Sequence, residues 1–258
     1  MENSKEHKLR KLFWIGFIKT IYVNLKLLPF RQAIKFPIVV TKKTTFGSLS
    51  GKLIIKGHCR FGMIRFGIFH SDLRSWKENR TYLNIQGDLI ARGWMQFGVG
   101  CKINIDKGAV LEIGDNVCIG SSSWIVCREH IKIGSNLRCA WDVQIMDTNF
   151  HYLKNIETGK VEKDMKPIII GNNNWIGNRS SVMQGTKTPD FFIVASNSIC
   201  NKDYTSLIPE YSVVGGSPAK LLKTGVCMVL DKEEKEIREI LKKTQKDFVI
   251  VEKSPRVK

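Results

Sequence analysis

A six-residue repeat constrains the fold of this chain more than any other feature of its sequence. Ile113-Gly-Asp-Asn-Val-Cys is followed by Ile119-Gly-Ser-Ser-Ser-Trp, and the unit returns as Ile170-Gly-Asn-Asn-Asn-Trp and Ile176-Gly-Asn-Arg-Ser-Ser. This period matches neither a helix nor a simple alternating strand. It predicts short parallel strands joined by tight corners, with the first and fifth positions pointing inward and Gly or Asn after the aliphatic residue supporting the bend. Triangular coils of three units then stack at the ~4.8 Å spacing of strands, as a solenoid.

The composition is that of a globular protein in a reducing compartment. Of the 258 residues, 43% are hydrophobic and 25% charged, which excludes a wholly disordered or collagen-like chain. The seven cysteines include no Cys-x-x-Cys pair, which argues for free thiols and against a structural zinc site. Four of them fall on repeat strands and are interpreted as small core residues, namely Cys118, Cys127, Cys139 and Cys200.

The positive charge gathers at the N-terminus. Residues 1–43 carry ten Lys or Arg and two Glu, within a chain of net charge +17. Such a segment suggests contact with an anionic surface. We do not expect nucleic acid as the partner, because no helix-turn-helix, zinc finger or aromatic RNA-binding motif is present. A membrane span is not expected either, because Lys19, Asn24 and Lys26 interrupt the apolar part, and no signal-peptide cleavage site follows.

Apolar residues in this segment recur at helical spacing, and Pro29 ends the pattern. The stripe consists of Leu9, Leu12, Phe13, Phe17, Ile21, Leu25 and Leu28. Two interpretations remain open at this point. The helix lies on an anionic bilayer, or it is a cap whose apolar stripe covers the end of the core.

Four segments are expected along the chain. Residues 1–37 form a basic amphipathic helical segment, and residues 38–98 form irregular leading coils of the same solenoid. Residues 99–223 form the regular repeat, which a loop at 147–167 interrupts. Residues 224–258 form a charged helical tail.

Two further motifs carry a family resemblance. Asn172-Asn-Asn-Trp-Ile-Gly177 and the closing Tyr211-Ser-Val-Val-Gly-Gly-Ser-Pro-Ala-Lys220 are similar to segments of the hexapeptide-repeat acyltransferases. The resemblance covers roughly residues 85–223 and is greatest to sugar O-acetyltransferases of capsule, exopolysaccharide and lipopolysaccharide pathways. It implies a mainly β fold, the left-handed parallel β-helix, and a homotrimer. The stretch Thr186 to Phe192 departs from the family's regular repeat.

The 147–167 loop is where we expect the chemistry, because loops that leave a rigid scaffold often carry function. By the resemblance, His151 matches the catalytic histidine. A neutral imidazole can take the proton of an attacking sugar hydroxyl at pH 7. Asp147 either fixes the imidazole tautomer or caps the loop turn. His130 is the alternative base, although it also fits a corner histidine. No metal is expected, because the three-histidine spacing of γ-type carbonic anhydrases is lacking.

The resemblance also implies the residues that bind the substrates. Trp175 matches a tryptophan that lines the donor and acceptor cleft, although it also fits packing outside the solenoid, as do Trp124 and Trp141. The coil edges expected to hold acetyl-CoA comprise Ser196, Asn201, Lys202, Lys220 and Lys223. The lysines also fit solvated surface positions.

Together these features predict a cytoplasmic acetyl-CoA-dependent O-acetyltransferase that acts on a sugar or glycan of surface polysaccharide. Residues 1–43 would hold it against the inner face of an anionic membrane. The alternatives are an N-acetyltransferase of an amino sugar or nucleotide sugar, and a scaffold without catalysis.

Overall fold

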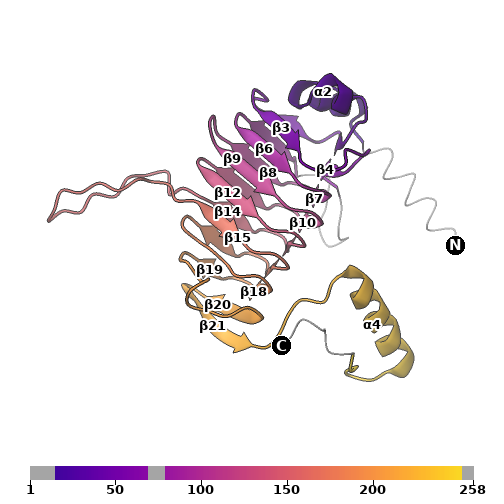
Figure 1. Cartoon of the computed structure of the whole chain (residues 1–258), viewed down its shortest axis with the longest axis vertical. Coiled ribbons are helices and arrows are strands. Elements are labelled where there is room, and N and C mark those ends of the chain that lie inside the picture. Colours follow the sequence, from indigo (N-terminus) through magenta and orange to yellow (C-terminus); the bar gives the residue numbers. More distant parts are fainter. Residues whose placement is uncertain (1–14, 69–78, 252–258) are drawn as a thin grey trace. The chain divides into compact units, whose positions relative to one another are not determined.

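The computed structural model describes residues 15–68 and 79–251. Its strands form three sheets that are parallel except for one closing hairpin, and the chain visits each sheet in turn as it winds along the stack (Figure 1). Strands of successive coils pair with each other, so that Ile103 of one coil is the register partner of Ile125 in the next. The mainly β, parallel solenoid predicted from the six-residue period is confirmed.

Among the described residues, the sheets contain nine, seven and five strands. In spatial order, the nine-stranded sheet consists of β1 (Ile38–Val40), β4 (Ile64–Phe66), β7 (Met95–Phe97), β10 (Val117–Ile119), β13 (Arg138–Cys139), β16 (Trp175–Ile176), β18 (Phe192–Val194), β20 (Ser212–Gly216) and β21 (Ala219–Thr224). The seven-stranded sheet consists of β19 (Ile199–Cys200), β17 (Ser181–Met183), β14 (Gln144–Met146), β11 (Trp124–Cys127), β8 (Lys102–Ile105), β5 (Tyr82–Ile85) and β2 (Thr45–Phe46). The five-stranded sheet consists of β15 (Ile168–Ile170), β12 (His130–Ile133), β9 (Val110–Ile113), β6 (Asp88–Ala91) and β3 (Lys52–Ile55).

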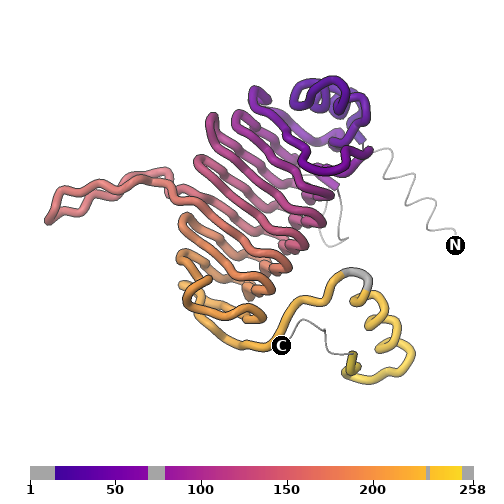
Figure 2. The backbone as a smooth tube through the Cα atoms, in the orientation of Figure 1, coloured from indigo at the N-terminus to yellow at the C-terminus, as the bar shows by residue number. Residues whose placement is uncertain are grey.

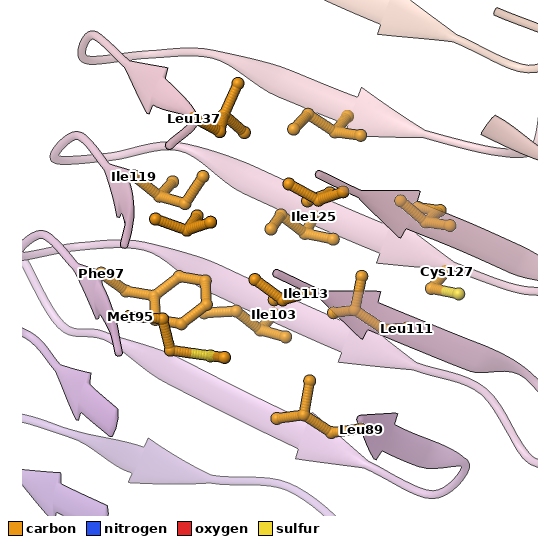
Figure 3. Close-up of a cluster of buried hydrophobic side chains, with 14 of the residues drawn as sticks. Leu89, Met95, Phe97, Ile103, Leu111, Ile113, Ile119, Ile125, Cys127 and Leu137 are labelled. Atoms are coloured by element: carbon orange, nitrogen blue, oxygen red, sulfur yellow. The ribbon is translucent and has the colours of Figure 1, made fainter. Parts of the chain in front are cut away.

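The core is a column of aliphatic side chains inside the coils. The first and fifth positions of the repeat are buried, as at Ile113, Val117 and Ile119, so the predicted inward positions are confirmed. Side chains of successive coils lie above one another in layers (Figure 3). The rings of Phe66 and Phe97, one coil apart, stack with their centroids 4.7 Å apart. Burial of this apolar surface stabilises the stack.

The corners differ from the prediction in one respect. The left-handed backbone conformation occurs at the fourth position of the repeat, as at Asn116 with φ of 56° and Asn136 with φ of 60°. The glycine at the second position is needed for another reason, because the backbones of neighbouring coils come close together there. A Cβ added to Gly134 would lie 2.5 Å from the carbonyl oxygen of Gly171 in the next coil. Glycine is therefore required there by close approach of two backbones.

The leading residues 38–98 stack in the same three sheets, and β1 to β7 pair in parallel with their neighbours. The irregular stretch Thr186 to Phe192 also follows the coil. Lys187 forms parallel bridges with both Ile169 and Asp203, which continues the five-stranded sheet without a regular strand.

In the part of the chain that the structure describes, α2 (Phe17–Leu27) and α3 (Phe30–Ala33) lie at the leading end of the stack. The first ends before Pro29 as predicted. Its start at Leu9 is not supported, because Ile15 bridges Thr41 and Gly16 precedes the helix. Gly16 lies so close to the edge strand that a Cβ there would be 2.9 Å from the Thr41 carbonyl oxygen. The stripe residues Leu9, Leu12 and Phe13 lie outside the described residues.

The other end of the first compact unit, residues 1–227, is closed by an antiparallel hairpin of β20 and β21. Residues 228–258 form a second unit with α4 (Asp231–Thr244), which confirms the predicted charged helix. Among the described residues, no helix combines the length and apolar character needed to cross a membrane.

Candidate active site

A long arm, residues 147–167, leaves the solenoid at the corner between β14 and β15 (Figure 2). Its two sides bridge in antiparallel fashion, Thr148 to Met165 and Lys154 to Val161. The N–H of Asn149 donates to the carbonyl oxygen of Asp164 at 2.9 Å. The arm is therefore a hairpin that projects from the rigid stack.

Arg128 fastens the base of the arm to the coil beside it. Its Nε donates to Asp106 Oδ2 at 2.9 Å, and its Nη1 donates to Asp164 Oδ2 at 3.3 Å. Asp164 is 4% exposed, so water and salt screen this second ion pair less than they screen a pair at the surface. The guanidinium carbon also lies 6.0 Å from the ring centroid of Phe150, the residue next to His151.

Asp147 is fully buried and its carboxylate organises the corner before β12. Oδ1 accepts the N–H of Arg128 at 2.8 Å, and Oδ2 accepts the N–H groups of Glu129 and His130, each at 2.9 Å. Burial raises the pKa of Asp147, and these three donors counteract the rise. The carboxylate therefore caps the corner at residues 128–130, whereas the prediction placed the cap at the turn of its own loop.

His151 is exposed near the base of the arm, four residues beyond Asp147. Phe150 before it has a φ of 63°, in the left-handed region, and lies at a bend of the chain. His130, the alternative base, begins β12 and donates its backbone N–H to Asp147, as expected of a corner histidine. Of the two, His151 is the histidine that projects with the arm.

The remaining predicted site residues lie at three places. Asn201 and Lys202 are exposed at the same type of corner as the arm, two coils further on. Ser196 lies at the corner between β18 and β19, where its Oγ donates to Asn178 Oδ1 at 2.6 Å. The third group lies on the nine-stranded sheet and its hairpin, with Trp175 on β16 and the exposed Lys220 and Lys223 on β21.

The structure thus places His151 with Asn201 and Lys202 along one edge, and Trp175 with Lys220 and Lys223 on the nine-stranded sheet. Trp175 is 45% exposed on the outer surface of that sheet. The arm starts at the edge between the other two sheets. Within one chain, the group with His151 and the group with Trp175 therefore lie on different sides of the solenoid.

The cysteines of the repeat strands are buried, as predicted for core residues. Burial raises the pKa of Cys200 to about 12. A thiol with such a pKa stays protonated at neutral pH and is a poor nucleophile.

The sequence did not reveal the ion pair between Arg128 and Asp164, which we call the clamp because it holds the base of the arm. The signal available in the sequence was a two-residue irregularity in the six-residue repeat, between His130 and Ile133. The partner, Asp164, lies on the far side of the arm, so only the folded arm reveals the pair.

No family model matches the chain. Two curated relatives are similar to about half of it. One is WbbJ of Escherichia coli (strain K12), named for O-acetyl transfer in lipopolysaccharide biosynthesis, with 28% identity over 134 residues, 49% of this chain and 66% of WbbJ. The other is a polysialic acid O-acetyltransferase of Escherichia coli O1:K1, with 27% identity over 46% of this chain and 38% of that protein.

A solved structure, that of the polySia-specific acetyltransferase NeuO, shares the fold. The match has a TM-score of 0.51 at 18% identity and covers 77% of this chain and 94% of NeuO. The chain is thus similar to acetyltransferases over about half of its length. These similarities confirm the predicted resemblance and the left-handed parallel β-helix fold. The matched regions span only 66% and 38% of the two curated relatives.

Proposed function

We propose that this acyltransferase relative transfers the acetyl group of acetyl-CoA to a sugar hydroxyl in surface-polysaccharide biosynthesis, with His151 as the general base. The observation that carries the proposal is the arm, which presents a histidine where it leaves the parallel β-helix. The names of the relatives, which describe O-acetyl transfer in lipopolysaccharide biosynthesis and to polysialic acid, support the same reaction.

The chemistry follows from the residue type. A sugar hydroxyl barely ionises at neutral pH, so its attack on a thioester needs a base. His151 takes the hydroxyl proton while the oxygen bonds to the acetyl carbon, and the proton then passes to the departing thiolate. A backbone N–H of a neighbouring coil supplies the oxyanion donor.

For the donor substrate, the exposed Lys202, Lys220 and Lys223 supply cations for the phosphates of acetyl-CoA.

A homotrimer would unite the two groups of site residues, because the arm of one protomer could meet Trp175 and the β21 lysines of its neighbour. Protein rings of this kind form through one repeated head-to-tail interface. The expected mass is three times 29.4 kDa. A cytoplasmic location fits both the supply of acetyl-CoA and the free cysteines.

The test is an acetyl-transfer assay with purified chain, acetyl-CoA and a panel of bacterial glycans, with product detection by mass spectrometry. We expect a product whose acetyl group is released by mild alkali, as an ester is and an amide is not. His151→Ala should lower kcat by about 10²- to 10⁴-fold, the usual contribution of a general base. His58→Ala, an exposed histidine of the leading coils, is the matched control and should leave kcat unchanged.

A thermal-shift measurement tests the donor separately. Acetyl-CoA at about a hundredfold excess over its dissociation constant should stabilise the native chain by about 2.7 kcal/mol. An alkali-stable product would replace the proposal with N-acetylation. No stabilisation and no effect of His151→Ala would identify a scaffold without catalysis.

A further inference from the structure

Helix α2 has one buried face and one face exposed to solvent. Its inner face packs on the solenoid through Val23 and Leu27, which are buried. The stripe residues Phe17, Ile21 and Leu25 lie on the opposite face and are exposed. The prediction that this stripe covers the end of the core is therefore wrong for these three residues, because the helix meets the core with its other side.

The inner face of α2 is sufficient to cover the end of the solenoid at strand β1. Asn24 Nδ2 donates to the carbonyl oxygen of Ile38 at 2.7 Å, and the Ile38 N–H donates to Asn24 Oδ1 at 3.1 Å. Thr20 Oγ1 accepts the N–H of Val40 at 3.2 Å. These side chains satisfy the edge strand β1, which would otherwise expose unpaired backbone groups. The fold of the cap therefore does not depend on the outer face.

Large apolar side chains are exposed on α3 and directly after it as well. We define the outer patch as Phe17, Ile18, Ile21, Leu25, Phe30 and Ile34. Phe17 is 76% exposed, Ile18 83% and Phe30 70%. Several large apolar side chains gathered on neighbouring exposed elements mark an interaction site rather than ordinary surface.

The charges around the outer patch specify the kind of partner. Residues 15–68 contain ten Lys or Arg and no Asp or Glu. Lys26, Arg31 and Lys35 are exposed on the helices that carry the patch or directly after them. A second copy of this chain would bring like charges together, which disfavours self-association through this face. Apolar side chains rimmed by cations instead match the headgroup region of an anionic bilayer.

We propose that the outer patch inserts into the interface of an anionic membrane, with Lys26, Arg31 and Lys35 against the lipid headgroups. The bilayer covers the side chains that the fold leaves exposed. This docking is independent of the acyl-transfer reaction, and it would bring the acetyltransferase to acceptors that are attached to the membrane.

Vesicle flotation with the purified full-length chain tests the proposal. We expect binding to phosphatidylcholine vesicles that contain about 30% phosphatidylglycerol, and at least tenfold weaker binding to phosphatidylcholine alone. Raising NaCl from about 0.1 to about 1 M shortens the screening length from ~10 to ~3 Å and should weaken the binding. Equal binding to both kinds of vesicle would overturn the role of the cations.

The triple variant Phe17→Ser, Ile21→Ser, Phe30→Ser should bind anionic vesicles about 100-fold more weakly than the unmodified chain, because it removes three inserting side chains. Its thermal unfolding should stay unchanged, since none of the three is buried. Leu207→Ser, at an exposed apolar residue between β19 and β20, is the matched control. Unchanged vesicle binding in the triple variant would overturn the proposal, as would a wild-type oligomer that this variant dissociates.

Discussion

At the residue scale, Asp147 shows how one buried carboxylate can organise a corner of the solenoid. It accepts three backbone N–H groups from residues 128–130 and so fixes the corner from which Arg128 reaches the arm. A carboxylate suits this position because its two oxygens can accept several donors at once. The residue is therefore a positioning residue for the arm that carries His151.

We expect Asp147→Ala to lower the free energy of unfolding by about 2–4 kcal/mol, because it leaves corner N–H groups without an acceptor. Urea titration followed by circular dichroism measures the change. Glu157→Ala removes an exposed carboxylate of the same arm and should change stability by less than about 0.5 kcal/mol. An Asp147→Ala chain as stable as the Glu157→Ala chain would contradict the capping role.

At the scale of elements, the arm behaves as a hairpin clamped at its base. Its antiparallel bridges hold the two sides together, and the ion pairs of Arg128 join it to the corner beside it. Geometry matters at this scale, because a displacement of about 1 Å in a catalytic group can cost a factor of about 10² in rate. The clamp determines how firmly His151 is presented.

Arg128→Ala should therefore reduce kcat/KM for acetyl transfer by about 10- to 100-fold while the solenoid stays folded. Trypsin should also cleave the arm faster, at Lys154 or Lys160, and this readout does not depend on catalysis. Arg92→Ala breaks an exposed ion pair with Glu112 on the solenoid and serves as the control. Equal proteolysis rates in the two variants would show that the clamp does not hold the arm.

At the scale of the whole molecule, the separation between His151 and Trp175 determines what an active assembly requires. One belongs to the arm at the edge of the five- and seven-stranded sheets, and the other to the outer surface of the nine-stranded sheet. A site that uses both residues needs contributions from two protomers of the proposed trimer.

Mixed oligomers test this arrangement. His151→Ala and Trp175→Ala chains, each of low activity alone, should regain activity when co-expressed, because some interfaces then combine an intact His151 with an intact Trp175. Random assembly makes about a quarter of the interfaces intact, so about a quarter of the wild-type rate is expected. Absence of any recovery in mixed trimers would place the whole site within one protomer.

The sequence by itself determined the solenoid, its inward positions and the place of the arm, because each follows from a local repeat and its interruption. Ile113 and Val117 could be assigned in this way. The role of His151 follows from the family resemblance and stays a proposal. Tertiary structure alone decided the contacts between segments distant in the chain. These include the pairing of Arg128 with Asp164, the corner capped by Asp147, and the approach of Gly134 to the coil below. It also decided which face of α2 is buried. Phe17, Ile21 and Leu25 form the stronger apolar stripe, but Thr20 and Asn24 face the edge strand because only polar side chains can satisfy its backbone groups.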